Sequence, residues 1–298
     1  IEKLSVELRE LEEFLKKAEE TNADLVLATD PDADRVGIAV KENDDYVLIS
    51  GNQVGILLTD YIAKTRKELG CMPENPVMVK SIVSSSLADA VAASHGVETI
   101  NVLTGFKYIG TEIKKLEDKG EEERFILGFE ESYGYLKGDY ARDKDAVVAS
   151  MLIAQMAMYY KNKNKNLVQA LEILYKTYGY FEEKTVSFKI EAVMPQQRMD
   201  EIMSGLRGEI PAEMDGKKIL EFRDYKAELI KDLATGKERS TGLPKSDVLY
   251  YVFEDGTHVA SAPPAPSRRL KPILWQTVKI GLIAIIRWKP MKPSLANC

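Results

Sequence analysis

Short apolar runs alternate with amphipathic stretches over the first half of the chain, and this alternation constrains the fold more than any other feature. The apolar runs have the length and composition of buried strands and lie at 23–29, 36–40, 77–83, 98–103 and 124–130. Helical patterns follow or separate them at 53–69, 86–96, 111–119 and 146–161. Strands joined through helices form a parallel sheet covered by those helices. We therefore predict an α/β fold with a mixed or parallel sheet.

The pattern changes in the second half of the chain. A strand at 187–193 and a helix at 196–208 come first, and a strand pair at 247–260 turns at Asp255 and Gly256. This half is expected to be a separate α+β domain. The predicted division is 1–42, carrying an acidic loop at its end, then 43–182, the α/β domain, and 183–298, the α+β part.

Composition excludes several classes of function. The chain has 298 residues, 45% of them hydrophobic, and a net charge of −6 with acids and bases interspersed. No basic stripe for nucleic acid and no polybasic membrane anchor is present, so an anionic ligand must be met by local groups. The apolar stretch Ile280–Ile286 is far shorter than the roughly 20 residues of a membrane span.

The two cysteines and the N-terminal stretch bear on the compartment. Cys71 and Cys298 lie far apart without metal-ligand spacing, which favours a reducing compartment, and the cytoplasm is expected. The chain starts without methionine on a charged amphipathic pattern, unlike a signal peptide. We expect it to be cut from a longer protein.

The first segment with chemical character is the acid loop, residues 30–35, between the runs at 23–29 and 36–40. Asp30, Asp32 and Asp34 alternate along it, so all three carboxylates can point to one side and repel one another unless a cation intervenes. A solvated acidic turn is the alternative. A calcium-binding EF-hand would need glycine and glutamate at the positions of Arg35 and Lys41, so this class of calcium site is excluded. A Mg²⁺ site remains, and the neighbouring Arg35 is suited to holding a phosphoryl oxygen.

Two further segments carry polar groups. In GFEESYGY, residues 128–135, Glu130, Glu131 and Ser132 lie between glycines, which suits a hydroxyl-rich ligand, although an ordinary polar loop remains the alternative. In ARDKDA, residues 141–146, Arg142 and Lys144 stand at a helix start where cations could meet phosphate. The alternative for these residues is a purely structural one, a capping cluster on a solvated helix end.

These motifs, in this order, resemble the phosphoglucomutase and phosphomannomutase (alpha-D-phosphohexomutase) superfamily, in particular its phosphoglucomutase-like branch. The likeness extends over about residues 1–261, including GNQVG, SSSLADA and LPKSDVLYYVFEDG. It implies that Asp30, Asp32 and Asp34 share one Mg²⁺ with a phosphoserine, and that Glu130 and Ser132 bind sugar hydroxyls.

The resemblance also implies roles for cations and for a specificity loop. Lys144 would face the substrate, in proton transfer or electrostatic stabilisation, while Arg35 would hold the phosphoryl group. Substrate contacts are also expected from four further residues: Thr104, Gly105, Lys107 and Arg142. For the stretch TGFKYIG, which holds three of these, an ordinary strand-to-helix turn is equally expected.

The reaction implied is reversible phosphate transfer between the C1 and C6 oxygens of a hexose, with glucose 1,6-bisphosphate as activator and intermediate. The specificity stays open between glucose, mannose, glucosamine and pentose phosphates. Members of the family have four domains, and this chain would begin inside the second. A non-catalytic fragment that only binds Mg²⁺ or a sugar phosphate is the competing interpretation.

Two departures from the family bear on activity. No serine stands in the family's T-A-S-H-N-P setting, and Ser94, in Ala93-Ser94-His95, is expected on a helix surface. After Ser261 the family's phosphate loop, R-P-S-G-T-E-P-K-I-K, is replaced by APPAPSRRLKPILWQ. Codons for RPSGTEPKIKTYFVA, read one base later, spell that string, so we predict a reading-frame change that makes residues 262–298 aberrant and the chain inactive alone.

Overall fold

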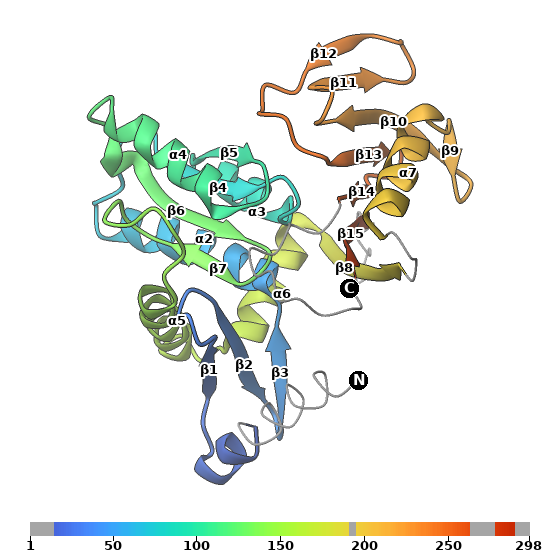
Figure 1. Ribbon diagram of the computed structural model, residues 1–298. Coiled ribbons are helices and arrows are strands. Elements are labelled where there is room, and N and C mark those ends of the chain that lie inside the picture. The colour runs from blue at the N-terminus through green and yellow to red at the C-terminus, as the bar shows by residue number, and fades with distance from the viewer. Residues whose placement is uncertain (1–14, 191–194, 263–277, 290–298) are drawn as a thin grey trace, which may run out of the picture. The chain divides into compact units, whose positions relative to one another are not determined.

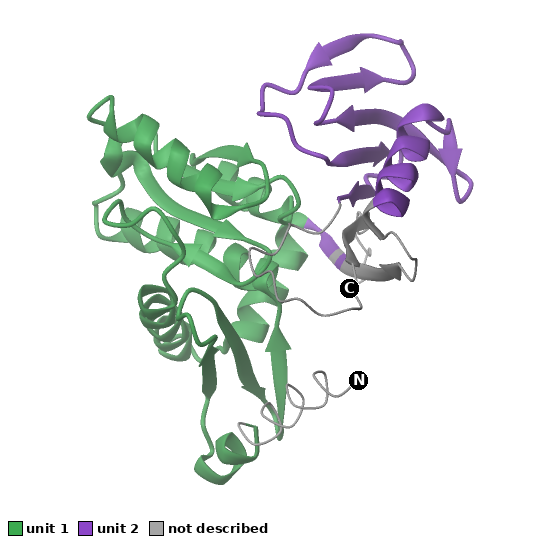
Figure 2. Cartoon of the chain, in the orientation of Figure 1, with its two compact units in different colours: residues 1–178 green, residues 179–298 purple. Residues whose placement is uncertain are grey.

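The computed structural model describes residues 15–190, 195–262 and 278–289 (Figure 1). The chain divides into two compact units, residues 1–178 and 179–298 (Figure 2). The three-part division expected from the sequence stays a prediction. No helix in the described ranges is both long enough and apolar enough to cross a membrane.

The first unit contains an antiparallel sheet of three strands, with the order β1 (Leu25–Thr29), β2 (Val36–Glu42) and β3 (Asp45–Ile49). The strands expected at 23–29 and 36–40 are thus present. Thr29 pairs with Val36, so the acid loop closes the β1–β2 hairpin. β3 was not expected, although four of its five residues are apolar; three of its five side chains are exposed.

A mixed sheet forms the centre of this unit, in the order β5 (Glu98–Val102), β4 (Val77–Ser81), β6 (Phe125–Glu130) and β7 (Gly134–Leu136). β5, β4 and β6 are parallel, and β7 is antiparallel to β6. The predicted α/β class is therefore confirmed. Because the carboxyl ends of parallel strands meet at one edge, the loops after β4, β5 and β6 gather there, where ligands bind in such sheets.

Helices α2 (Gly51–Glu68) and α4 (Phe106–Glu117) cover opposite faces of this sheet (Figure 1). A Cβ on Gly128 would lie 2.6 Å from Ile109 of α4, and one on Gly55 of α2 would lie 2.4 Å from the Phe129 ring. Gly128 and Phe129 are neighbours on β6, so they point to opposite faces. Both helices approach closely because each contact has a glycine on one side.

The start of α4 differs from the expectation. The sequence predicted a helix at 111–119 with TGFKYIG as a loop, whereas α4 begins at Phe106. Phe106, Ile109 and Ile113 recur at helical spacing and are buried in the core cluster of the mixed sheet. Lys107 therefore lies in the first helical turn and not in a loop.

Among the described residues, this unit also has helices α3 (Leu87–Ser94), α5 (Ala146–Lys161) and α6 (Leu167–Tyr178), the short 3-10 helix η1 (Glu122–Arg124), and a helical stretch at residues 15–21 before β1. α5 has the predicted bounds, whereas α6 was not predicted. The buried carboxylate of Asp60 on α2 accepts hydrogen bonds from Lys64 (2.6 Å) and Tyr160 (2.8 Å) and pairs with His95 (2.9 Å). Burial raises its pKa, but these bonds outweigh burial and lower the pKa to about 2.

In its described residues, the second unit has an antiparallel sheet and helix α7 (Pro195–Gly208). Its strands are β8 (Tyr180–Ile190), β9 (Glu213–Met214), β10 (Lys217–Asp224), β11 (Leu229–Asp232), β12 (Glu238–Ser240), β13 (Leu249–Phe253), β14 (His258–Ser261) and β15 (Val278–Lys289). The main path runs β12-β11-β10-β13-β14-β15-β8. Methionines of α7 pack on Phe222 and Tyr251. The predicted turn joins β13 to β14, with Gly256 at φ +78°.

The predicted reading-frame change falls on residues 262–298, of which 263–277 and 290–298 lie outside the described residues. Residues 278–289 form β15, which pairs antiparallel with β14 and with β8. The apolar stretch Ile280–Ile286 belongs to this strand. The frame change itself stays a prediction.

Candidate functional site

The acid loop folds back on its own first carboxylate. Oδ1 of Asp30 accepts hydrogen bonds from the backbone N–H groups of Asp34 (3.1 Å) and Arg35 (3.2 Å). Ala33 turns the chain in the left-handed region, at φ +53°. The carbonyl of Ala33 accepts a hydrogen bond from the N–H of Ala146, the first residue of α5 (3.1 Å). The loop is thus tied to the start of that helix.

Two of the three aspartates approach each other. Burial raises the pKa of Asp30, but hydrogen bonds from the backbone N–H groups of Arg35 and Asp34, together with the Arg35 charge, lower it overall. Asp34 is partly buried, whereas Asp32 is exposed. Across residues 15–190, 195–262 and 278–289, no three Asp, Glu, His or Cys side chains gather as a metal site. The three-aspartate metal site stays a prediction.

Lys144 supplies the positive charge next to these carboxylates. Its Nζ lies 2.8 Å from Oδ2 of Asp34 and 3.0 Å from Oδ1 of Asp143, and 5.7 Å from the centroid of the Phe106 ring. The side chain is only 11% exposed. Burial lowers the pKa of Lys144, but the hydrogen bonds to the two aspartates raise it overall. The group is therefore an ammonium ion at neutral pH.

The turn between β6 and β7, residues 131–133, lies directly against the acid-loop hairpin. The N–H of Val36 donates to the carbonyl of Tyr133 (3.1 Å), and Arg35 forms an antiparallel bridge with Gly134. A Cβ on Gly134 would lie 2.2 Å from Cδ of Lys144, so a larger residue here would displace the lysine side chain. The two segments singled out from the sequence therefore face each other.

Glu130 ends β6 inside this region and is 5% exposed. One of its oxygens accepts a hydrogen bond from the N–H of Gly105 (2.5 Å), in the loop before α4. Burial and the neighbouring Glu131 charge raise the pKa of Glu130 to about 7, against smaller opposing effects of the Gly105 bond and of Lys144 and Arg35. Ser132, two residues on, is half-buried.

Three of the remaining predicted substrate contacts lie at the start of α4 or just before it. Thr104 is exposed and Gly105 adopts φ +118° in the turn that meets Glu130. Lys107 is exposed, with its ammonium 4.8 Å from the ring centroid of Tyr108.

Arg142 points elsewhere. Its guanidinium donates to Glu117 (2.8 Å), the last residue of α4. At 1.5 Å per residue, this end lies about 16 Å along the helix axis from Phe106, which contacts Lys144. Arg142 is therefore not brought to the acid loop, and its substrate role stays a prediction.

The loop after β4 also lies in this region, although no residue of it was predicted as part of the site. Ser81 and Ser84 lie at the same sheet edge as Glu130, and both are buried. Their hydroxyl groups contact the carboxylate of Glu131. A serine-rich stretch directly after a buried strand is the signal that could have identified them, because polar side chains at a strand's carboxyl end line the ligand edge of such sheets.

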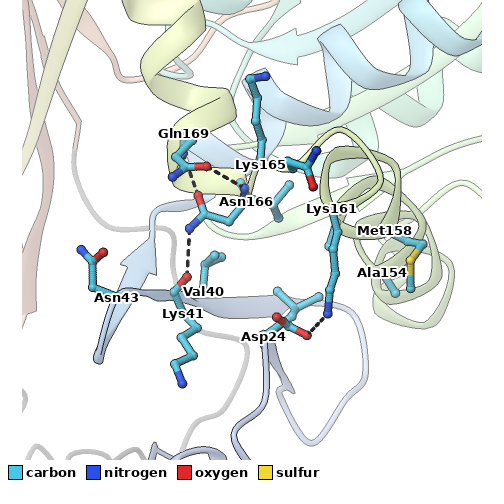
Figure 3. Close-up of a pocket in the computed structure, with 14 residues that line it drawn as sticks. Asp24, Val40, Lys41, Asn43, Ala154, Met158, Lys161, Lys165, Asn166 and Gln169 are labelled. Atoms are coloured by element: carbon cyan, nitrogen blue, oxygen red, sulfur yellow. Dashed lines mark hydrogen bonds and ion pairs between the residues drawn. The ribbon is translucent and has the colours of Figure 1, made fainter.

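A cavity of about 690 Å³ lies at the other end of the β1–β2 hairpin, between Leu25 and Val40 on one side and α5 and the start of α6 on the other (Figure 3). Its charged and amide groups bond mainly to each other: Lys161 pairs with Asp24 (2.5 Å), and Asn166 donates to the Lys41 carbonyl (3.0 Å). The converging carboxylates and cations lie instead at the acid loop, so the candidate site is placed there.

Comparisons with known proteins bear on the family of the chain. Residues 50–178 match the family described as phosphoglucomutase/phosphomannomutase, alpha/beta/alpha domain III. The chain belongs to the alpha-D-phosphohexomutase superfamily.

The similar curated proteins are phosphoglucomutases. One from Staphylococcus epidermidis is 36% identical over 251 residues, which are 84% of this chain and 44% of that protein. One from Staphylococcus aureus MRSA252 is 34% identical over 264 residues, which are 88% of this chain and 46% of that protein. This chain therefore spans less than half the length of these relatives.

Solved structures share the fold. Parafusin, a phosphoglucomutase from Paramecium in its open form, matches with a TM-score of 0.56 at 18% identity, over 92% of this chain and 42% of its own. A phosphoglucomutase/phosphomannomutase family protein from Burkholderia thailandensis matches with a TM-score of 0.55 at 13% identity, over 97% and 47%. At such identities the likeness concerns the fold alone.

Proposed function

We propose that this chain is part of a phosphoglucomutase-type mutase, an enzyme that interconverts hexose 1-phosphate and hexose 6-phosphate through a bisphosphorylated intermediate. The observation that carries the proposal is the direct contact between the acid-loop hairpin and the β6–β7 turn, through Val36 and Tyr133, with Lys144 between them. This places carboxylates, cations and a buried glutamate around one small region. A phosphorylated sugar needs these groups together.

Each residue has a role that its surroundings support. Glu130 and Ser132 would bind ring hydroxyls, because a carboxyl group and a hydroxyl can accept and donate to vicinal hydroxyl groups. Arg35 would hold a phosphoryl oxygen, and Lys144, as an ammonium ion, would stabilise charge on the transferring group rather than remove a proton. Thr104, Gly105 and Lys107 would contribute to specificity.

Mg²⁺ is part of the proposal, and the donor set fits it in chemistry. Asp30 and Asp34 offer hard carboxylate oxygens side by side, and Asp32, exposed in the same loop, would complete the set. The ion would neutralise charge on the phosphoryl group in transfer. Without it, Lys144 already balances Asp34.

Activity from this chain alone is expected to be negligible. None of its serines stands in the family's phosphate-donor setting, and the stretch after Ser261 lacks the glycine-rich phosphate loop. Positioning and electrostatics supply most of the catalysis in phosphoryl transfer, so losing the donor and the distal clamp costs many orders of magnitude in rate. We place the parent enzyme in the cytoplasm, which suits the exposed free thiol of Cys71.

The test measures turnover and binding separately. A coupled assay from glucose 1-phosphate to glucose 6-phosphate, with Mg²⁺ and glucose 1,6-bisphosphate, is expected to show no turnover. Calorimetry with glucose, mannose and ribose 1-phosphates is expected to show binding of one of them, lost in Glu130→Ala and kept in Glu112→Ala, a control on α4 whose carboxylate pairs with Lys115. Absence of binding to all three would contradict the proposed site, and normal turnover would contradict the expected inactivity.

A further inference from the structure

A serine pair at the end of β4 holds the carboxylate of Glu131. Oγ of Ser81 lies 2.7 Å from Oε2 of Glu131, and Oγ of Ser84 lies 3.5 Å from the same oxygen. The two hydroxyl oxygens are 2.8 Å apart. Each hydroxyl has one proton, so Ser84 can donate to Ser81 while Ser81 donates to the carboxylate. Such a chain of hydrogen bonds strengthens the last one.

The serine pair is a fixed support. Ser81 is fully buried and Ser84 is 1% exposed. Ser84 closes a tight turn by donating its N–H to the Ser81 carbonyl (3.0 Å). The following residue, Ser85, donates its N–H to the side chain of Asn52 on α2 (3.0 Å). A buried network with satisfied partners is rigid, so the carboxylate of Glu131 is held in one place.

The turn that Glu131 begins is strained and tightly enclosed. Tyr133 adopts φ +66°, a conformation that costs a non-glycine residue energy and persists only when its surroundings hold it. On the side of α2, Gly51 leaves no room: a Cβ there would lie 2.1 Å from the Glu131 carbonyl oxygen. On the other side, the carbonyl of Tyr133 accepts the N–H of Val36.

We propose that Glu131 is a positioning residue of the sugar site: anchored by Ser81 and Ser84, its carboxylate holds the β6–β7 turn against the acid-loop hairpin. This inference rests on the proposed function of the site. Glu131 stands between Glu130 and Ser132, and the oxygen that faces the serine pair is turned toward β4. The anchored Glu131 therefore sets where its two neighbours meet a ligand.

The experiment compares Ser81→Ala and Glu131→Gln with Ser94→Ala. Ser94 is a matched control, since its hydroxyl bonds to the Val91 carbonyl (2.7 Å) and to Tyr178 (2.8 Å), away from the site. In the ligand-free protein, hydrogen exchange of the Val36 amide reports the bond to Tyr133. In Ser81→Ala and Glu131→Gln this amide is expected to exchange about tenfold faster or more, because each variant loses a hydrogen bond to a charged group. The loss is local, so the midpoint of unfolding should stay near that of the parent.

A second readout concerns Glu130 and also needs no ligand. Carbon-13 NMR of its carboxyl group should show a lower pKa in Glu131→Gln, because the neighbouring negative charge is gone, and little change in Ser94→Ala. The proposal is overturned if Val36 exchange matches the parent in both test variants, or if protection falls equally throughout the unit.

The third readout is affinity for glucose 1-phosphate, expected to weaken about tenfold in Ser81→Ala and not in Ser94→Ala. If the parent binds no sugar phosphate, the proposed function fails, while the exchange and titration results still decide whether Glu131 anchors the turn. Unchanged affinity in Ser81→Ala, with binding by the parent, would contradict a role in positioning the ligand-binding groups.

Discussion

At the scale of single residues, Lys144 is the cation that contacts the acid loop, helix α4 and the β6–β7 turn. It pairs with Asp34 of the acid loop, packs over Phe106 at the start of α4, and occupies the space beside Gly134. A long side chain can bury its methylene groups in this way while its ammonium reaches a carboxylate. The positive charge of Lys144 would therefore repel a metal ion bound at the acid loop.

Replacing Lys144 by methionine tests this opposition. Methionine keeps an apolar chain over Phe106 but removes the ammonium, so Asp34 is released and repulsion of a divalent cation disappears. We expect the affinity for Mg²⁺, measured by calorimetry, to rise about fivefold, equivalent to roughly 1 kcal/mol for one charge at a partly exposed site. Lys161→Met is the control, because Lys161 pairs with Asp24 at the far end of the hairpin. Equal or weaker Mg²⁺ binding by Lys144→Met would contradict the placement of the metal.

Glu130 makes stability depend on pH. Its pKa rises from an ordinary 4.5 to about 7 on folding, through burial and the Glu131 charge, so the folded state holds a proton that the unfolded state releases. The free energy of unfolding should fall as pH rises from 4.5 to 7, by at most about 3 kcal/mol. Glutamine cannot ionise, so Glu130→Gln should gain stability relative to the parent at pH 8 and match it most closely near pH 4.

Urea unfolding of the parent and of Glu130→Gln at pH 5 and pH 8 measures the difference. Glutamine retains a carbonyl oxygen for the Gly105 N–H, so the comparison isolates the charge. An identical pH dependence of the two proteins would show that Glu130 is ionised in the folded state at neutral pH.

At the scale of elements, the first residue of α2 decides how closely this helix approaches the β6–β7 turn. Ser50 and Gln53 form a capping box, with Ser50 accepting the Gln53 N–H (3.3 Å) and Gln53 accepting the Ser50 N–H (2.8 Å). The cap fixes where α2 starts, and Gly51 then abuts the backbone of Glu131. Tyr135 adds a hydrogen bond from its hydroxyl to the Gly51 carbonyl (2.9 Å).

Gly51→Ala should therefore destabilise the first unit by about 1–3 kcal/mol, the usual cost of forcing an extra methyl group into a packed contact. Thermal unfolding provides the measurement. Gly205→Ala is the control within helix α7, because a Cβ there meets no atom within 4 Å, and alanine in a helix favours stability. A Gly51→Ala protein as stable as the parent would mean that α2 and the turn can move apart freely.

At the scale of the whole molecule, the composition of the second unit changes after Ser261. In the second unit, the strand pair β13–β14 and helix α7 have a shared core around Phe222, Leu249 and Tyr251. Residues 262–272 are rich in proline and arginine, unlike the residues before Ser261. β15 then adds to the edge that β14 offers.

Sequencing the encoding DNA tests the reading-frame change predicted after Ser261. We expect the frame shifted by one base to encode RPSGTEPKIKTYFVA or a close variant at this place. A protein made from the corrected frame should unfold at a higher temperature than the present chain, because a loop selected for the fold replaces one that is not. A DNA sequence with no such alternative translation would end this interpretation.

Much of the fold could be predicted from the sequence. Val77–Ser81 and Phe125–Glu130 are strands because their short apolar runs can only be buried between helices, and α5 has its predicted bounds because Asp145 caps it and apolar residues recur along it. The start of α4 was missed, since Gly105 and Thr104 are typical of a loop and only burial of Phe106 extends the helix. α6 was missed although Leu167, Ala170, Leu171 and Leu174 recur at helical spacing, and β3 was missed although four of its five residues are apolar.

The sequence by itself determined which residue types are available: an aspartate-rich loop after one buried strand, a glutamate pair after another, and a lysine at a helix start. Those choices are local, since strand ends and turns follow from neighbouring residues. Only the tertiary structure decided their partners. Lys144 meets Asp34, Glu131 meets Ser81 and Arg142 turns to Glu117, because such contacts depend on which strand edges and helix ends packing brings together.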